Sequence, residues 1–287
     1  MEDKDFPALY QSANDLSLNS QSQFFTALRF HLIALVVAAV LSIVSVTHWI
    51  VAALQVFALL AALACSVYLF SVRPEKLWYG GRAVAESIKT ITWRYVCRAE
   101  PFQGDDQVAR KDFHHTLKAI IEQNREVCRA LTDYLDGTQI SHVMEQIRSQ
   151  PLNKRKKIYI ESRVGDQHTW YANQAKFNRR RARYFFGALI AINTFAVICA
   201  VVRVANVDVP FWPTDIFVAS AASILTWMQA KRFSELAASY SLTSHEIGLV
   251  KEEAKQPNTD EEFSVFVGDA ENAFSREHTQ WVARKDV

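Results

Sequence analysis

Two long apolar blocks interrupt a chain that is otherwise polar and charged. The first, from Leu32 to Val72, contains no Asp, Glu, Lys or Arg. A helix needs about 20 apolar residues to cross a bilayer core, so this block is long enough for two crossings. We expect helices over Phe25–Val46 and Ile50–Val72, joined by a turn at Thr47–Trp49. The alternative, a buried helical hairpin of a soluble protein, would be unusually long and apolar on all sides.

The second apolar block is less uniform. Tyr184–Val202 predicts a third spanning helix, and Asp215–Ala230 predicts a fourth after a Pro-containing loop over 203–213. The fourth helix is short and carries several polar residues, so on its own it would insert only marginally. As the partner of the third helix in a second hairpin, it is plausible.

The remaining residues show helical periodicity of the kind that buries one face. Between the blocks we expect helices over 82–97, 112–136 and 140–148, then one long helix from 154 into the membrane. After the second block we expect helices over 236–247 and 260–284. Their apolar faces predict a small helical bundle. Ahead of the first hairpin, Phe6–Tyr10 could dock on this bundle, but a partly ordered arm is favoured, with Ser20 or Ser22 capping the first membrane helix.

The predicted fold is therefore an all-α integral membrane protein with four transmembrane helices in two hairpins and a cytoplasmic helical bundle. Its expected parts are a polar N-terminal arm (1–24), the first hairpin (25–72), a cytoplasmic helical region leading into the third transmembrane helix (73–183), the second hairpin (184–230) and cytoplasmic C-terminal helices (231–287).

Basic residues flank both hairpins at the ends away from their turns, which predicts a multi-pass protein with both termini in the cytoplasm. The net charge of only +2 gives no bias toward nucleic acid, and we expect no nucleic-acid partner. Two basic clusters could contact anionic lipid or a nucleotide phosphate, or could simply set the orientation in the membrane. Their members are Lys154, Arg155, Lys156, Lys157, Arg179, Arg180, Arg181 and Arg183.

Catalytic and metal-binding patterns are missing from the sequence. There is no HExxH, GxxxxGK[ST] or GxSxG motif. Four cysteines, at positions 65, 97, 128 and 199, form no CxxC pair and lack metal-ligand spacing. We therefore expect no enzyme activity, no catalytic residue, no bound metal and no cofactor.

The fourth predicted helix carries the most informative polar pattern. Asp215, Thr226 and Gln229 share one helical stripe with two alanines, and Ser223 lies beside it. The third helix adds Asn193. Small and hydroxyl residues allow helices to approach closely and to hydrogen-bond, so the stripe could pack against another helix. It could instead line a water-filled oligomeric pore with Asp215 at the outer mouth.

Several short stretches resemble the SLATT family, whose domains pair a membrane hairpin with flanking helices. They are Tyr159–Arg163, Asp166-Gln167, Trp170-Tyr171, Ala175–Ala182 and Phe274–Trp281. In the N-terminal half, Phe6–Tyr10 and Trp78–Lys89 resemble a second copy, which implies a tandem form with a hairpin in each half. The resemblance implies a bacterial inner-membrane effector, and the family has no established active-site residues to transfer.

Our leading hypothesis is a homo-oligomeric pore or membrane-depolarising effector in antiphage or conflict defence. Its partners would be membrane lipid, further copies of itself and a separate nucleotide-signal sensor or synthase. The alternative is a non-conducting anchor or signalling scaffold whose cytoplasmic helices recruit partners. A membrane enzyme would be a third class, but no set of residues supports it.

Overall fold

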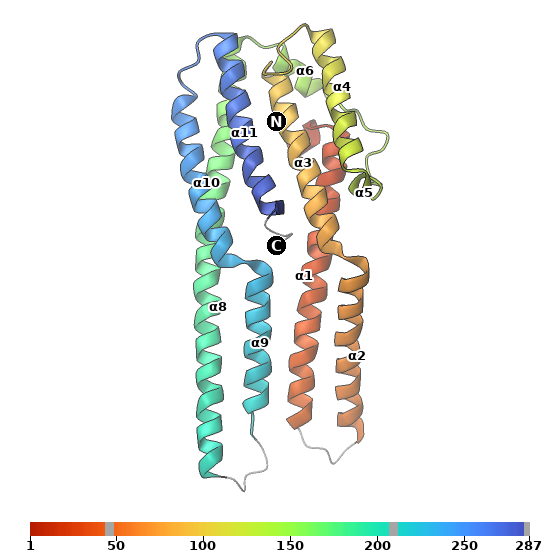
Figure 1. Cartoon of the computed structure of the whole chain (residues 1–287), viewed down its shortest axis with the longest axis vertical. Helices are drawn as coiled ribbons and strands as arrows, with labels where there is room; N and C mark the ends of the chain where they lie inside the picture. Colours follow the sequence, from red (N-terminus) through yellow and green to blue (C-terminus); the bar gives the residue numbers. More distant parts are fainter. Residues whose placement is uncertain (44–48, 207–211, 284–287) are drawn as a thin grey trace. The chain divides into compact units, whose positions relative to one another are not determined.

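The computed structural model describes residues 1–43, 49–206 and 212–283, with side chains described through Phe274, and its regular structure in these ranges is helical (Figure 1). Most of the turn predicted at Thr47–Trp49 and part of the loop over 203–213 lie outside the described residues. The elements are a 3-10 turn η1 (Asp3–Asp5), α1 (Ala8–Ile43), α2 (Trp49–Val72), α3 (Pro74–Val96), α4 (Asp106–Gln123), α5 (Arg125–Cys128), α6 (His142–Arg148), α7 (Leu152–Tyr159), a π-helical segment η2 (Ile160–Gly165), α8 (Asp166–Ala205), α9 (Thr214–Lys231), α10 (Phe233–Glu253) and α11 (Asp260–Ala283).

These helices form two compact units. The bundle unit contains residues 1–21, 75–172 and 242–287, and the hairpin unit contains residues 22–74 and 173–241. Helices α1, α8 and α10 each contribute residues to both units. The covalent connections between the units are therefore largely helical.

The hairpin unit pairs α1 with α2 and α8 with α9 (Figure 1). Among the described residues, the helical stretches Ala8–Ile43, Trp49–Val72 and Leu152–Ala205 are long and apolar enough to cross a membrane. They contain the second and third predicted spans and the first as far as Ile43, and residues 44–46 of that first span lie outside the described residues. Helix α9 does not meet the same criterion, as its polar composition suggested.

Both hairpins end in the same way. The helices α2 and α9 stop at an arginine in the left-handed conformation, Arg73 with φ 48° and Arg232 with φ 50°. A new helix starts at the next residue, Pro74 or Phe233. Glycine usually occupies such a position, so a shared non-glycine residue there is an unusual local feature. The order hairpin, left-handed arginine, helix thus occurs twice in the chain.

The N-terminal segment differs from the predicted arm. Helix α1 already starts at Ala8, so Ser20 and Ser22 lie inside it and cap nothing. Phe6 and Tyr10 are buried, and the Phe6 ring lies 4.7 Å from that of Tyr10 and 6.2 Å from that of Trp93. Docking on the bundle, the less favoured prediction, is what the structure shows. Burial of these two aromatic side chains supplies the apolar contact that a partly ordered arm would lack.

The helix predicted over 112–136 is wrong at its C-terminal half. Helix α4 ends at Gln123, where the side chain and backbone N–H of Asn124 both donate to the Ile120 carbonyl. After the single turn of α5, the chain is irregular, and Tyr134 adopts a positive φ of 58°. Asparagine competes for backbone hydrogen bonds in this way, which terminates the helix despite continued apolar spacing.

Aromatic side chains fill the core of the bundle unit. Trp93, Tyr95 and Val84 on α3 are fully buried, as are Phe102 in the following loop and Phe113 on α4. The rings of Tyr95 and Phe113 lie 4.8 Å apart, and Phe102 packs edge-on against both. This cluster fixes the loop between α3 and α4, which carries the polar network described below.

Candidate functional site

The polar stripe predicted on the fourth membrane helix lies on α9, and the described residues do not cover it. Asp215, Thr226 and Gln229 are exposed, and Ser223 is half-buried. Asn193 is also exposed on the neighbouring helix α8. The structure therefore places the α9 residues on one exposed side of the helix, as the spacing predicts.

The other side of α9 packs against α8. The ring of Phe217 stacks on Phe195 with centroids 6.0 Å apart and an angle of 22° between the planes. Ala221 on α9 and Ala196 on α8 are both buried, which indicates close approach of the two helices. Helix α9 thus packs Phe217 and Ala221 toward its own hairpin and leaves polar side chains exposed, together with Val218 and Leu225.

Two of the exposed polar side chains find a partner within their own helix. The Thr226 hydroxyl donates to the Ala222 carbonyl at 2.9 Å, and the Asn193 amide donates to the Leu189 carbonyl at 2.9 Å. These bonds lower the cost of facing an apolar medium, because the Thr226 hydroxyl and one of the two Asn193 N–H groups have an acceptor. Both side-chain oxygens keep lone pairs for water or for another copy of the chain.

The first hairpin contains a polar contact that sequence reasoning missed. His31 on α1 has Nδ1 3.0 Å from the Ala62 carbonyl and 3.3 Å from the Ser66 hydroxyl on α2. A carbonyl only accepts, so we assign the proton to Nδ1. The sequence shows a histidine directly before the apolar block, which could have drawn attention to His31. Its hydrogen-bond partners on α2 could be identified only from the fold.

A buried ion pair connects the π-helical segment with α11. Arg163, 2% exposed, donates from Nε to Oε1 of Glu271 at 2.9 Å and from Nη2 to Oε2 at 2.7 Å. Glu271 is 0% exposed and also accepts a 3.0 Å hydrogen bond from the Tyr159 hydroxyl. The Arg163 guanidinium lies over the Phe274 ring at 5.0 Å. The π-helical segment directly precedes α8, and such segments are frequent at functional positions.

Electrostatic attraction to Glu271 keeps the Arg163 guanidinium of this buried pair charged. Burial opposes the charge of Arg163, but Glu271 outweighs it and raises the guanidinium pKa above its ordinary value. Burial, reinforced by the Glu271 charge, raises the pKa of Tyr159 well above its ordinary value. Neither Arg163 nor Tyr159 is suited to exchange protons near neutral pH, so their role here is to stabilise the contact between the π-helical segment and α11.

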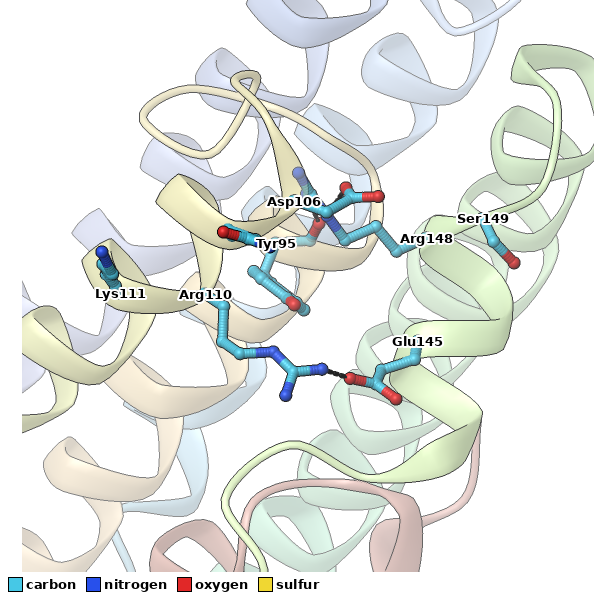
Figure 2. A pocket seen from close by; sticks show the side chains of 8 residues that line it. Tyr95, Asp106, Arg110, Lys111, Glu145, Arg148 and Ser149 are labelled. Carbon is cyan, nitrogen blue, oxygen red and sulfur yellow. Dashed lines mark hydrogen bonds and ion pairs between the residues drawn. The ribbon is translucent and has the colours of Figure 1, made fainter.

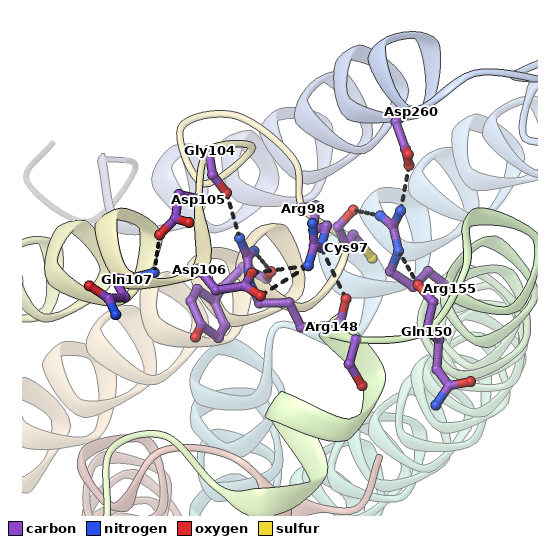
Figure 3. A network of polar contacts seen from close by, with 12 residues as sticks. Cys97, Arg98, Gly104, Asp105, Asp106, Gln107, Arg148, Gln150, Arg155 and Asp260 are labelled. Atoms are coloured by element: carbon purple, nitrogen blue, oxygen red, sulfur yellow. Dashed lines mark hydrogen bonds and ion pairs between the residues drawn. The ribbon is translucent and has the colours of Figure 1, made fainter.

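The basic cluster at 154–157 contains side chains that bond within the bundle and side chains that are exposed at the surface. Arg155 is 3% exposed and donates to the Cys97 and Gln150 carbonyls and to Asp260 (Figure 3). Lys156 donates to two carbonyls in the connection between α10 and α11. These side chains hold the bundle together, which corrects the prediction that they contact lipid or phosphate. Lys154 and Lys157 are exposed.

The second basic cluster remains at the surface. Its members are all exposed along α8, and they are Arg179, Arg180, Arg181 and Arg183. The Arg181 guanidinium lies over the Phe177 ring of the same helix at 5.2 Å. These residues are accessible, so contact with lipid head groups stays a prediction for them, whereas the buried part of the first cluster is not accessible.

A polar network fixes the loop that precedes α4. Arg148 is buried and donates to the Tyr95 carbonyl at 2.6 Å, to the Gly104 carbonyl at 3.2 Å and to the Asp106 carboxylate at 2.9 Å. Arg98 donates to the same carboxylate at 3.0 Å (Figure 3). Asp106 and Arg148 are far apart in the sequence, so no local pattern predicts this network.

A cavity of about 600 Å³ opens beside this network. Figure 2 shows an ion pair between Arg110 of α4 and Glu145 of α6 on one side of it. Its lining consists of Tyr95, Asp106, Gln107, Arg110, Lys111, Glu145, Arg148 and Ser149. Both carboxylates are already paired with arginines, and among the described residues no group of three His, Cys, Asp or Glu could hold a metal ion. The cavity could admit a small polar molecule, but its paired charges indicate no particular reaction.

Comparison with protein families matches both halves of the chain. Residues 7–156 match the family model described as SMODS and SLOG-associating 2TM effector domain 3. Residues 159–281 match the model described as SMODS and SLOG-associating 2TM effector domain 1. No curated protein and no solved structure matches the chain. The division near residue 157 agrees with the repeated order of hairpin, left-handed arginine and helix.

Proposed function

This chain belongs to the family of SMODS and SLOG-associating 2TM effector domains and carries two of them in tandem, and we propose on that basis that its copies assemble into a regulated pore. Domains of this family are membrane effectors associated with defence systems. The pore would depolarise the bacterial inner membrane during antiphage or conflict defence. The proposed protein has four spans, both termini and the bundle in the cytoplasm, and no enzyme activity.

The observation that carries this proposal is the outward polar stripe of α9. The helix has 18 residues and is about 27 Å long, close to the thickness of a bilayer core. It packs its apolar side on α8 and leaves Asp215, Thr226 and Gln229 exposed. Polar groups exposed at membrane depth are costly in lipid and favour a water-filled pathway or a protein contact. A ring of α9 helices from several copies would supply both.

Regulation would come from the bundle unit. Helix α8 runs from Asp166 to Ala205 and contributes residues to both units, so it would be the segment through which a change in the bundle unit acts on the hairpin unit. The π-helical segment and the Arg163–Glu271 pair lie at that end. A signal, for example from a separate nucleotide sensor or synthase, would open the pore only if it bound the two states differently.

The charge of Asp215 gives a direct test of the pore. In planar bilayers containing the full-length protein, a pore with a ring of Asp215 carboxylates should prefer cations, and Asp215→Lys should shift the reversal potential toward anions. Ile50→Lys, at an exposed apolar position in the first turn of α2, is the matched control, because α2 does not carry the stripe, and it should not change selectivity. Equal effects of the two changes would contradict a pore lined by this stripe.

Cells supply the second test. Bacteria carrying the intact protein in the inner membrane should lose the signal of a potential-sensitive dye during phage infection. The combined change Thr226→Val and Gln229→Leu should weaken the loss while the oligomer in detergent keeps its mass. Abundant membrane protein with an unchanged dye signal throughout infection would refute the pore.

A non-conducting scaffold is the second candidate, and one observation favours it. The Thr226 hydroxyl and one N–H of the Asn193 amide donate within their own helices, so at these two side chains the need for water or a partner is reduced. In a scaffold, the same substitutions would alter only stability. Unchanged conductance and unchanged toxicity in the Asp215→Lys variant would favour this alternative.

A further inference from the structure

Two cations and two aromatic rings meet where α1 and α9 contact each other in the hairpin unit. The Lys231 ammonium lies 3.2 Å from the Phe25 ring centroid and 5.2 Å from that of Trp227. The Arg29 guanidinium lies 5.7 Å from the same Trp227 centroid. Phe25 and Trp227 pack edge to face at 5.7 Å. One indole is thus shared by two positive charges from different hairpins.

These two charges have no acidic partner among the described residues. None of the ion pairs in that part of the chain includes Arg29 or Lys231. The adjacent Arg232, in contrast, pairs with Glu235. Aromatic faces attract cations but do not neutralise them. Two like charges held around one ring therefore favour a shared anion.

The location indicates which anion is available. Lys231 is the last residue of α9, and Arg29 lies one helical turn after Phe25 on α1, before the long apolar part of that helix. Tryptophan prefers the depth of the lipid head groups, and basic pockets between membrane helices bind anionic head groups. Arg29 is exposed and Lys231 half-buried, so a head group can reach both.

We propose that Arg29 and Lys231 bind the phosphate of an anionic phospholipid at the contact between α1 and α9. The guanidinium offers a two-pronged set of N–H donors and the ammonium a compact charge, and both are suited to phosphate oxygens. Trp227 and Phe25 pack beneath the head group. The lipid would tie the two hairpins together. The site rests on the proposed insertion of α9 into the membrane, but it does not require conduction.

Native mass spectrometry of the delipidated full-length protein in detergent tests this site. Phosphatidylglycerol and phosphatidylcholine are titrated separately, and inorganic phosphate is added in a third arm. We expect preferential binding of phosphatidylglycerol, weakened at least about tenfold by the combined change Arg29→Gln and Lys231→Gln. The matched control, Lys118→Gln with Lys251→Gln, removes two exposed charges from α4 and α10 in the bundle unit and should bind phosphatidylglycerol like the parent protein.

A charge-conserving variant separates binding from folding. Arg29→Lys with Lys231→Arg keeps both cations and should retain most of the lipid binding, even if the glutamine variant is unstable. Equal binding by the Arg29→Gln and Lys231→Gln variant, or equal weakening in the bundle-unit control, would overturn the proposal. Displacement of the lipid by millimolar inorganic phosphate would instead assign the site to a soluble anion. Failure of the conductance tests would leave these results unaffected, so the two proposals can fail separately.

Discussion

Replacing Glu271 by glutamine removes one charge from the buried contact between α11 and the π-helical segment. The carboxylate accepts two hydrogen bonds from Arg163 and one from Tyr159, and neither the glutamate nor the arginine is exposed to solvent. Glutamine has nearly the same shape but can offer only one oxygen. Its NH₂ group would face an N–H or O–H donor where an acceptor is needed.

The loss should be large because the arginine stays behind. Breaking a buried ion pair by removing one partner costs about 3–5 kcal/mol, since the remaining charge is left without a counter-ion. That is a substantial part of the roughly 5–15 kcal/mol that stabilises a typical domain. If the loss is confined to local opening, amide exchange in the segment should accelerate by about two to four orders of magnitude.

Hydrogen–deuterium exchange of the full-length protein in detergent measures this opening directly. Peptides covering 157–170 should lose protection in the Glu271→Gln variant, as should peptides around residue 271. The matched control is Glu246→Gln, the same change at an exposed position of α10, where the effect should stay within about 0.5 kcal/mol.

A double substitution distinguishes a charge effect from lost packing. Arg163→Met with Glu271→Met removes both charges and keeps the volume apolar, so it should recover most of the protection lost in the single variant. The reasoning fails if Glu271→Gln changes exchange no more than Glu246→Gln does. It also fails if the double variant is less protected than the single one.

Three further predictions concern the bundle unit. Cys97 is fully buried, and burial raises its thiol pKa well above the ordinary value. In the folded protein, N-ethylmaleimide should therefore not alkylate Cys97, whereas the half-buried Cys128 should react. Mass spectrometry of the labelled peptides measures both reactions. Burial lowers the pKa of Lys89, so between the folded and unfolded pKa values the unfolded chain binds more protons, and stability should rise as the pH increases toward the ordinary lysine pKa of about 10.4. Lys89→Met should flatten this rise in urea unfolding. A Cβ added at Gly81 would meet backbone atoms of α1 at 3.0 Å, so Gly81→Ala should destabilise by about 1–3 kcal/mol in thermal unfolding, whereas Gly268→Ala, with nothing within 4 Å, should not destabilise.

The sequence was most informative where one physical requirement dominates. Apolar length alone placed α2 to within one residue, because a helix in lipid must be long and uncharged. The polar stripe on α9 was also predictable, because residues three and four apart share a helix face. Which surface this stripe meets was left open, since spacing does not reveal what lies opposite.

The missed features depend on partners that are distant in the sequence. Arg155 looked like one of four equivalent basic residues, yet its partners include the Cys97 carbonyl, just after α3, and the Asp260 carboxylate of α11. His31 lies next to the apolar block and was not singled out from the sequence, because its hydrogen-bond acceptor belongs to another helix, α2. Both side chains are polar groups whose burial is tolerated only because the fold brings a specific acceptor to them. Local patterns do not contain that information.

The tandem arrangement suggests a division of labour between the two hairpins. Both end at a left-handed arginine, but α2 is apolar on nearly all sides and α9 is not. A helix such as α2 can face lipid without assistance, whereas α9 needs water or protein along its stripe. Placing both kinds in one chain lets a single copy present one hairpin to lipid and the other to its neighbours. An assembly built this way would then be lined by the second hairpin only, so cysteines introduced along α9 should be labelled by charged thiol reagents in the open state, while cysteines along α2 should remain inaccessible.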